Sequence, residues 1–237
     1  MDVRHELAAR RAPETLSSPF LQCQTTQHGG VETLAAGSLT PVGGAAKRGF
    51  DVCVSATLLL AGLPFLIFIW LLVRLSSRGP GLYFQQRGGF AGKSFRIVKF
   101  RTLSRCDQRE VTQVVTDDIR VTSLGKFLRR TSLDELPQFY NVLVGDMSLI
   151  GPRPHALQHD QAFAEIDARY VERFAARPGI TGLAQVQGSR GPTNTEEKIW
   201  QRTKLDVQYV RHWTLLVDAR IVFRTALLLV RGDRNAF

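Results

Sequence analysis

The chain has few cysteines, and their spacing excludes a disulfide scaffold. Its 237 residues include three cysteines, at Cys23, Cys53 and Cys106, an odd number with no Cys-x-x-Cys pair. Unpaired cysteines are typical of a reducing compartment rather than of a secreted protein. We also expect no signal peptide, because no apolar core follows the first arginines.

Acidic residues are scarce relative to basic ones. Lys and Arg number 31 against 21 Asp and Glu, which gives a formal net charge of +10. This excess favours an anionic partner, and by itself it leaves nucleic acid, a lipid surface and a phosphorylated substrate open. The apolar share of 44% is high enough to exclude disorder throughout the chain. The length fits one domain with appendages.

Charged residues are missing altogether from one long stretch. Val52–Val73 comprises 22 residues without a charge, and basic residues lie beyond both of its ends. A helix of this length reaches ~33 Å, which is sufficient to cross a ~30 Å hydrocarbon core. The sequence therefore favours a membrane-inserted helix over the alternative, a buried core helix.

Two features of this stretch bear on its topology. Positive charge at both ends favours neither orientation of a straight span. Gly62 and Pro64 lie within the stretch, and Pro64 removes a backbone hydrogen bond and is expected to kink the helix. We therefore favour a kinked re-entrant helix, which enters the membrane and returns to the same face, over a straight span.

The rest of the sequence predicts an α-rich α/β membrane-associated single domain. We expect a disordered tail at 1–46, the re-entrant helix with its flanks at 47–80 and the main domain at 81–237. The last helix is amphipathic, so it either lies in the membrane interface or packs on the core. One short strand is expected at 94–101, and helices are expected at 123–130, 132–144, 155–175, 195–212 and 215–230.

Asp134 and Glu135 form a pair of adjacent carboxylates in a basic setting. Ser132-x-x-Glu135 also matches a capping box, in which both side chains satisfy amides at a helix N-terminus, and this structural role is the stronger reading of the isolated motif. The two roles can coexist, because the helix dipole favours an ionised carboxylate in the first turn. An ionised Asp134 close to a metal and to Arg129 can attack phosphorus as a nucleophile.

Arginines near this pair are candidate phosphate ligands. Arg129, Arg153 and Arg87 are the candidates, since cations must screen the charge of a reacting phosphate. Arg153 is the best of them, because the segment Gly151–Pro154 contains two prolines that restrict the backbone around it.

Other motifs are weaker. Gly88–Ser94 resembles a phosphate-binding P-loop, but Arg87 stands where the first glycine is required. His155 and His159 are spaced to share one face of a helix, with Asp160 adjacent, and could ligate a metal. A pair of surface histidines is the favoured interpretation, because no second ligand cluster supports the site. Asp107, Asp117 and Asp118 are expected in loops.

Six stretches, in order along 47–237, resemble the bacterial sugar transferases, also called polyprenyl-phosphate glycosylphosphotransferases. The matching stretches are Lys47-Arg48-x-x-Asp51, Lys99–Thr102, Ser132–Asn141, Gly145–Pro154, Arg177–Gly182 and Asn235–Phe237. So many long motifs in register make the resemblance specific.

The resemblance implies a fold and a reaction. Such enzymes are single domains with a re-entrant membrane helix and interfacial amphipathic helices, which hold the catalytic site at the cytoplasmic face of the bacterial inner membrane. They transfer a sugar 1-phosphate from a UDP-sugar to undecaprenyl phosphate and release UMP, as the first membrane step of exopolysaccharide or glycan synthesis. The family uses Mg²⁺. The donor would be a hexose such as glucose or galactose, although the sequence does not identify the sugar.

Roles are carried over to matching positions. Asp134 would be the nucleophile that takes the phosphosugar covalently and would bind the metal, and Glu135 would be its partner in a catalytic dyad. Arg129 and Arg153 would bind phosphates. Leu63 precedes Pro64 where the family often has serine, and Arg190 lies one position later than the usual arginine, so Arg190 is a weaker nucleotide contact.

The expected partners are a UDP-sugar, polyprenyl phosphate and a lipid membrane. A homo-oligomer is compatible with the sequence, and no nucleic acid is expected, because the uncharged stretch argues against a nucleic-acid-binding protein. The alternative function is a catalytically silent membrane scaffold for other enzymes of glycan assembly.

Overall fold

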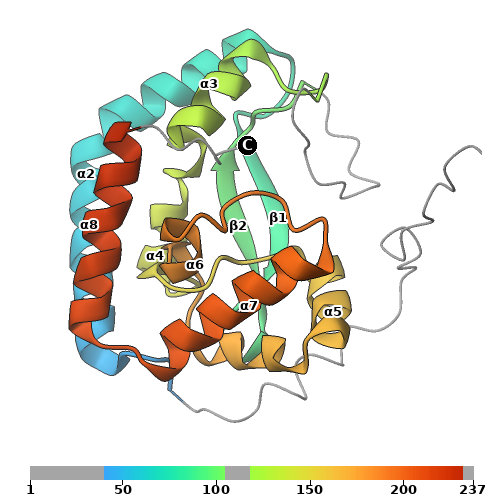
Figure 1. The fold of residues 1–237 in the computed structure, drawn as a ribbon. Helices are drawn as coiled ribbons and strands as arrows, with labels where there is room; N and C mark the ends of the chain where they lie inside the picture. The colour runs from blue at the N-terminus through green and yellow to red at the C-terminus, as the bar shows by residue number, and fades with distance from the viewer. Residues whose placement is uncertain (1–39, 105–117, 232–237) are drawn as a thin grey trace, which may run out of the picture.

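The computed structural model describes residues 40–104 and 118–231 (Figure 1). Helices predominate in this part of the chain, and the strands form two sheets of two strands each. This composition confirms the prediction of a helix-rich domain with a small sheet. The expected tail up to residue 39, Asp107, Asp117 and the motif Asn235–Phe237 lie outside the described residues.

The uncharged stretch lies within the longest described helix, α2, Gly44–Ser76. Within the described residues it is the one helix that is long and apolar enough to cross a membrane. Pro64 lies inside the helix, which continues past it. In Figure 1 the ribbon of α2 rises along one side of the molecule and then turns across its top. Most of its apolar side chains are exposed, which excludes the alternative of a buried core helix.

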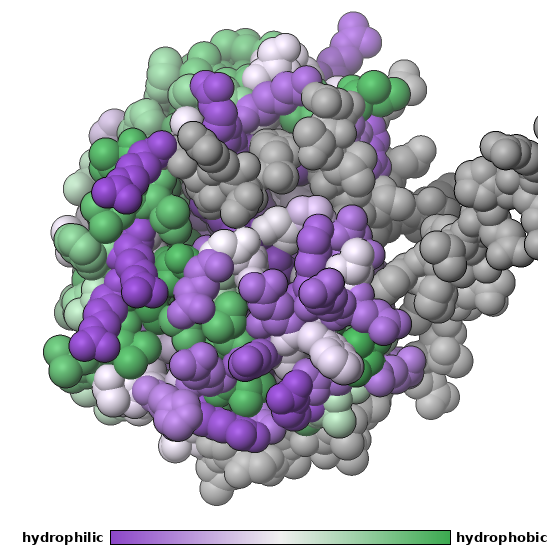
Figure 2. Space-filling model, viewed as in Figure 1, coloured by the Kyte–Doolittle hydropathy of each residue, from purple (hydrophilic) through white to green (hydrophobic). Residues whose placement is uncertain are grey.

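A second helix, α8 (Leu215–Arg231), lies beside α2 in Figure 1. Lys47 of α2 and Asp218 of α8 form a buried ion pair, with 2.6 Å between Nζ and Oδ2. Most outward side chains of α8 are apolar, with Phe223 65% exposed, and Arg220 and Arg224 are exposed among them. Figure 2 shows hydrophobic residues gathered along the side of the molecule where α2 and α8 lie. This exposure favours the interfacial alternative for the last helix over core packing.

The base of α2 is tied to the rest of the domain by side chains from the first family-like motif. Both terminal nitrogens of Arg48 donate hydrogen bonds to the carbonyls of Val142 and Leu143. The buried Asp51 carboxylate accepts a hydrogen bond from the backbone amide of Leu149. This motif therefore anchors the apolar helix.

The predicted strand at 94–101 is confirmed as β2, Ser94–Phe100. It pairs antiparallel with β1, Leu82–Gly88, which was not predicted. The connection is a short 3₁₀ turn, η2, Phe90–Gly92. The P-loop-like segment is thus the turn of a hairpin, whereas a true P-loop leads from a strand into a helix.

Two predicted helices are divided in the structure. The segment expected at 132–144 forms the 3₁₀ helix η3 (Leu133–Glu135) followed by α4 (Gln138–Val144), because Ser132 adopts a left-handed conformation and Pro137 lies between the two helices. The segment expected at 155–175 is broken at Asp167, whose side chain accepts a hydrogen bond from the Arg169 amide and starts a new helix.

The remaining elements complete the domain around α4 and β3. Strand β3 (Ser148–Ile150) pairs parallel with β4 (Gly179–Thr181). The predicted helices at 123–130 and 195–212 are confirmed. The other helices are α3 (Ser123–Thr131), α5 (Leu157–Ile166), η4 (Ala168–Ala175), α6 (Leu183–Val186) and α7 (Glu196–Arg211).

Candidate active site

The carboxylate pair lies on the short turn between α3 and α4. Ser132 ends α3 in the left-handed region, with φ of 59°, and the chain then makes the single turn of η3. Asp134 and Glu135 are 8% and 7% exposed. Burial of adjacent carboxylates is costly unless cations accompany them, and the surrounding elements provide these cations.

Glu135 is held between two cationic side chains. Its Oε1 lies 2.8 Å from Nζ of Lys99 on β2 and 2.7 Å from a terminal nitrogen of Arg153, and a second Arg153 nitrogen lies 3.3 Å from Oε2. Burial alone would raise the pKa of Glu135, but attraction to Arg153 and Lys99 outweighs it and holds the pKa well below its usual range. Glu135 is therefore ionised at neutral pH.

Asp134 is in a different electrostatic situation. It receives none of the hydrogen bonds that Lys99 and Arg153 donate to its neighbour. Burial, followed by the negative charge of Glu135, raises the pKa of Asp134 to about 6. Asp134 is thus a buried carboxylate that becomes ionised near neutral pH and keeps its oxygens available for another partner.

The capping-box interpretation is wrong. Ser132 makes no capping hydrogen bond with its side chain. Its hydroxyl accepts a hydrogen bond from Arg190, at 2.6 Å, and the Glu135 carboxylate binds Lys99 and Arg153 instead of a backbone amide. The left-handed backbone at Ser132 is the physical reason, because a capping residue requires an extended backbone.

The structure brings three of the four predicted arginines around the carboxylate pair. Arg153 binds Glu135 directly. Arg129 donates from Nε to the Thr102 hydroxyl at 2.8 Å, and its charge interacts with both carboxylates. Arg190 reaches the turn through Ser132. These side chains come from three separate segments and create a cationic surrounding for the pair.

Arg87 is directed elsewhere. One of its terminal nitrogens lies 3.2 Å from the carbonyl oxygen of Pro154, and the other donates to the Gln85 side chain at 2.5 Å. Burial, and then repulsion by Arg153, lowers its pKa to about 10. Arg87 therefore supports the segment that carries Arg153 rather than binding either carboxylate directly.

The interpretation of His155 and His159 as a surface pair is wrong. His155 is buried, and its Nδ1 lies 2.6 Å from the Tyr170 hydroxyl. His159 is half-buried and stacks on Phe163. Burial, followed by the charges of nearby arginines, lowers the pKa of both imidazoles. Among the described residues, no group of three or more His, Cys, Asp or Glu side chains is arranged to hold a metal.

Lys99 is the site residue that sequence reasoning missed. It belongs to the stretch Lys99–Thr102, whose members serve different partners: Lys99 binds Glu135, Arg101 donates to the carbonyls of Ser77 and Arg78, and Thr102 binds Arg129. The motif itself was visible in the sequence. Its pairing with a carboxylate 36 positions away was not.

The donor set fits a magnesium ion that is shared with a substrate. Mg²⁺ is usually bound through one or two carboxylates together with substrate phosphates and water. The oxygens of Asp134 suit this role, because Lys99 and Arg153 bind Glu135 and leave Asp134 without those hydrogen bonds. A site of this kind requires no cluster of protein ligands.

Comparisons with known proteins give the family. The model of the bacterial sugar transferase family matches residues 42–232. The chain is 47% identical over 192 residues to the UDP-glucose:undecaprenyl-phosphate glucose-1-phosphate transferase of Caulobacter vibrioides, covering 81% of this chain and 72% of that protein. It is 41% identical over 216 residues to a Klebsiella pneumoniae protein of the same name, covering 90% of this chain and 46% of that protein.

A shorter relative matches over nearly its full length. The exopolysaccharide production protein PSS of Rhizobium leguminosarum bv. phaseoli is 44% identical over 192 residues, which cover 78% of this chain and 96% of that protein. The chain thus spans less than half of the Klebsiella protein and nearly all of the Rhizobium protein. It belongs to the bacterial sugar transferase family.

Proposed function

We propose that the protein transfers a sugar 1-phosphate from a UDP-sugar to undecaprenyl phosphate and releases UMP. The names of the Caulobacter and Klebsiella relatives state this reaction with UDP-glucose as donor, so glucose 1-phosphate is the group we propose. The name of the Rhizobium relative supports a role in exopolysaccharide production. The observation that carries the proposal is the unequal pair of buried carboxylates, one fixed by cations and one left reactive.

The proposed reaction consists of two successive displacements at phosphorus. In the first, an Asp134 carboxylate oxygen bonds to the phosphorus that bears the sugar, and the bond from that phosphorus to the bridging oxygen breaks, so that UMP leaves. In the second, a phosphate oxygen of undecaprenyl phosphate bonds to the same phosphorus and the bond to Asp134 breaks. The nucleophile is thereby regenerated, and the lipid diphosphate sugar is released.

Glu135 is less suited to the first attack. Both of its oxygens accept hydrogen bonds from cations, which stabilise the carboxylate and lower its nucleophilicity. Its role is to hold Lys99 and Arg153 in place. Arg153, Arg129 and Arg190 attract the phosphates and stabilise the charge that develops on them. Bound Mg²⁺, held by Asp134 and substrate phosphates, would supply further charge neutralisation.

We also propose that α2 is re-entrant and that the site faces the cytoplasm at the inner membrane. The proposal is supported by contacts at both ends of α2 to one domain. Arg48 and Asp51 join its base to α4 and the β3 strand, and Arg101 binds the carbonyls of Ser77 and Arg78 directly after its other end. A straight span would place these two sets of contacts on opposite faces of the bilayer.

The test measures UMP release by the purified protein in nanodiscs with undecaprenyl phosphate, Mg²⁺ and a panel of UDP-sugars. We expect release with UDP-glucose, and loss of release in Asp134→Asn or with a chelator. Glu165→Gln, which removes an exposed carboxylate on α5, is the matched control and should retain full activity. Release of UMP with UDP-galactose but not with UDP-glucose would identify UDP-galactose as the donor. No UMP release by the folded protein with any UDP-sugar of the panel would favour the scaffold function.

A covalent phosphosugar on Asp134 is a separate prediction of the proposed mechanism. Incubation with UDP-glucose and Mg²⁺ in the absence of undecaprenyl phosphate should add the mass of a hexose phosphate to the protein. The adduct should be absent in Asp134→Asn and should disappear when undecaprenyl phosphate is added. Transfer that proceeds in Asp134→Asn at the wild-type rate would exclude Asp134 as the nucleophile.

A further inference from the structure

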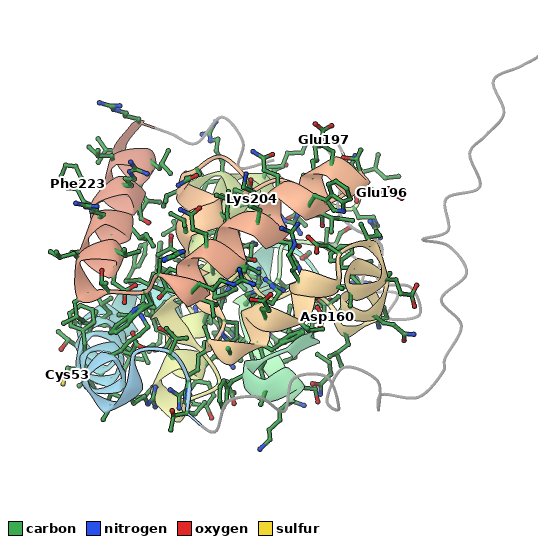
Figure 3. The ribbon with its side chains drawn as sticks, turned by 60° about the horizontal axis from the view of Figure 1, so that its bottom comes forward. Cys53, Asp160, Glu196, Glu197, Lys204 and Phe223 are labelled. Atoms are coloured by element: carbon green, nitrogen blue, oxygen red, sulfur yellow. The ribbon has the colours of Figure 1, made fainter. Side chains whose placement is uncertain are left out.

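A buried polar cluster lies behind the candidate active site and contacts neither carboxylate of the pair. Its six members come from the segment after β3 and from α5, η4 and α7, and each is less than 8% exposed. Figure 3 labels Asp160 on α5, which belongs to this cluster, and Lys204 on α7, which is exposed and does not belong to it. The members of this cluster, called here the His155 cluster, are His155, Asp160, Tyr170, Arg173, Arg202 and Asp206.

One branch of the cluster fixes the backbone of Arg153. Arg173 forms a buried ion pair with Asp206, at 2.9 Å, and the same guanidinium nitrogen donates a hydrogen bond to the carbonyl oxygen of Arg153. The backbone of the arginine that binds Glu135 is thus held by a buried charged group, Arg173, which is 3% exposed. Because the partner is a backbone atom, this contact sets the place from which the Arg153 side chain extends.

The second branch fixes the backbone around Arg190. A terminal nitrogen of Arg202 donates to the carbonyl oxygens of Ser189, at 2.6 Å, and Gly191, at 2.5 Å. These two carbonyls flank Arg190, whose side chain binds Ser132 at the start of the catalytic turn. The segment that carries Arg190 contains two glycines, Gly188 and Gly191, and Gly188 has a φ of 88°. External hydrogen bonds are therefore needed to give it one conformation.

His155 joins the two branches. Its Nδ1 lies 2.6 Å from the Tyr170 hydroxyl and 3.0 Å from Arg173, and its Nε2 lies 3.2 Å from a terminal nitrogen of Arg202. Burial and the neighbouring arginines keep the pKa of this imidazole well below its usual range, so the ring is neutral. A neutral imidazole has one donor and one acceptor nitrogen.

Arginines face both nitrogens of the ring. Arginine can only donate, and Nδ1 lies 3.0 Å from Arg173 while Nε2 lies 3.2 Å from Arg202, so the unprotonated nitrogen accepts from one guanidinium in either tautomer. The Tyr170 oxygen accepts from Arg173 at 2.8 Å, and its hydroxyl proton goes to Asp160 at 2.6 Å. The neutral ring therefore lies between the Arg173 and Arg202 branches whichever nitrogen carries its proton.

We propose that His155 is a positioning residue that links the Arg153 and Arg190 segments, through Arg173 and Arg202, so that both arginines bind one UDP-sugar. The kinetic consequence rests on the proposed function, whereas the linkage itself does not. A diphosphate donor presents two phosphates at a fixed separation, so an error in the spacing of the two arginines weakens donor binding. Undecaprenyl phosphate, with one phosphate, depends less on that spacing.

The first test is kinetic and uses the full chain in nanodiscs. His155→Phe keeps a ring but removes both nitrogens, and we expect the KM for UDP-glucose to rise about tenfold, while the KM for undecaprenyl phosphate changes less than twofold. His155→Gln keeps an acceptor toward Arg202 and should restore most of the donor KM. His212→Gln, at the exposed end of α7, is the matched control and should change neither constant.

A general packing role predicts another result. It would reduce the yield of folded protein in His155→Phe without changing the donor KM, and it would give no advantage to glutamine. A folded His155→Phe with the wild-type KM for UDP-glucose would overturn the proposal. If His155→Phe does not fold, Tyr170→Phe interrupts the same chain by removing one hydroxyl, and it should raise the same KM severalfold; an unchanged donor KM in a folded Tyr170→Phe would also overturn it.

The second test is independent of activity. The ¹⁵N chemical shifts of His155, assigned by their absence from the spectrum of His155→Gln, should show one protonated and one unprotonated ring nitrogen at pH 7. A doubly protonated ring, which cannot accept from either arginine, would overturn the proposal even if the enzyme is active. A neutral ring in a protein that releases no UMP from any donor would contradict the proposed function and leave the linkage standing.

Discussion

At the scale of single residues, the two adjacent carboxylates differ because their partners differ. Glu135 is surrounded by the charges of Lys99 and Arg153, whereas Asp134 is buried beside a negative neighbour. The same substitution of carboxylate by amide should therefore have opposite effects on stability at the two positions.

Asp134→Asn should stabilise the fold at alkaline pH. The pKa of Asp134 is about 6 in the folded protein against 3.8 for the free group, so the folded state binds more protons between these values and the free energy of unfolding falls as pH rises through this window. The penalty is complete above pH 6 and is on the order of 2–3 kcal/mol. Thermal unfolding in detergent should show a higher Tm for the variant at pH 8, with the difference shrinking toward pH 4. An equal difference at both pH values would contradict the raised pKa.

Glu135→Gln should destabilise the fold instead. The amide leaves Lys99 and Arg153 close together without a counter-charge, and breaking a buried pair by removing one partner costs about 3–5 kcal/mol. Unfolding at pH 8 should occur at a lower temperature than in the wild type. The double variant Lys99→Met, Glu135→Gln should recover part of the loss, because it also removes one of the two unpaired cations. A Glu135→Gln protein as stable as the wild type would show that these cations are solvated.

Some of this site could be predicted from the sequence and some could not. The adjacency of Asp134 and Glu135 and the rigid segment around Arg153 are local patterns. The left-handed backbone of Ser132 could not be predicted from neighbouring residues, since serine adopts that region rarely. The Ser132 side chain also binds Arg190, 58 positions away in the sequence. The surface position predicted for His155 was wrong for the same reason, because its burial results from the packing of segments that are distant in the sequence.

At the scale of elements, α2 and α8 are attached to the domain by a few buried apolar side chains and by polar contacts at their bases. Most of their apolar side chains face outward, but Ile69 and Val73 of α2 and Ile221 of α8 pack in the hydrophobic core. Lys47 and Asp218 are the buried pair between them, and Asp218 also accepts hydrogen bonds from Tyr209 and Trp213. One ion pair thus organises the junction of both helices.

Lys47→Met should loosen this junction. The substitution leaves Asp218 buried without its cation, and we expect a loss of about 3–5 kcal/mol. Limited proteolysis in nanodiscs should cut the segment between α7 and α8 faster than in the wild type. Lys47→Met combined with Asp218→Asn removes both charges and should restore part of the resistance. Wild-type resistance in Lys47→Met alone would mean that apolar contacts hold the junction.

Element prediction succeeded where a pattern was long and failed where it was short. The helices α3, α7 and α8 lie within one or two residues of the expected bounds, because each has a sustained periodicity. The strands β3 and β4 have three residues each and pair in parallel across more than 25 positions. No window of sequence carries that information, since their pairing is set by tertiary contacts.

At the scale of the whole molecule, exposed apolar residues gather on the side of α2 and α8, and arginines of α8 are exposed among them. Figure 2 shows hydrophobic residues at this side, interspersed with hydrophilic ones, and hydrophilic residues over much of the rest of the face. We expect a chain with a net charge of +10 to be attracted to an anionic lipid surface and the apolar residues of α2 and α8 to insert there. The carboxylate pair is buried in the domain to which both ends of α2 are attached.

This arrangement predicts that both ends of α2 lie on one side of the membrane. In a background with Cys23, Cys53 and Cys106 replaced by serine, Ala46→Cys and Arg78→Cys place single thiols at exposed positions before and after the apolar stretch. A membrane-impermeant maleimide should label both in inverted vesicles and neither in intact cells, because the contacts of Arg48 and Arg101 hold both ends on the domain. Leu63→Cys, within the stretch, should resist labelling from either side. Labelling of the two ends from opposite faces would establish a straight span, and the contacts of one end would then have to break in the membrane.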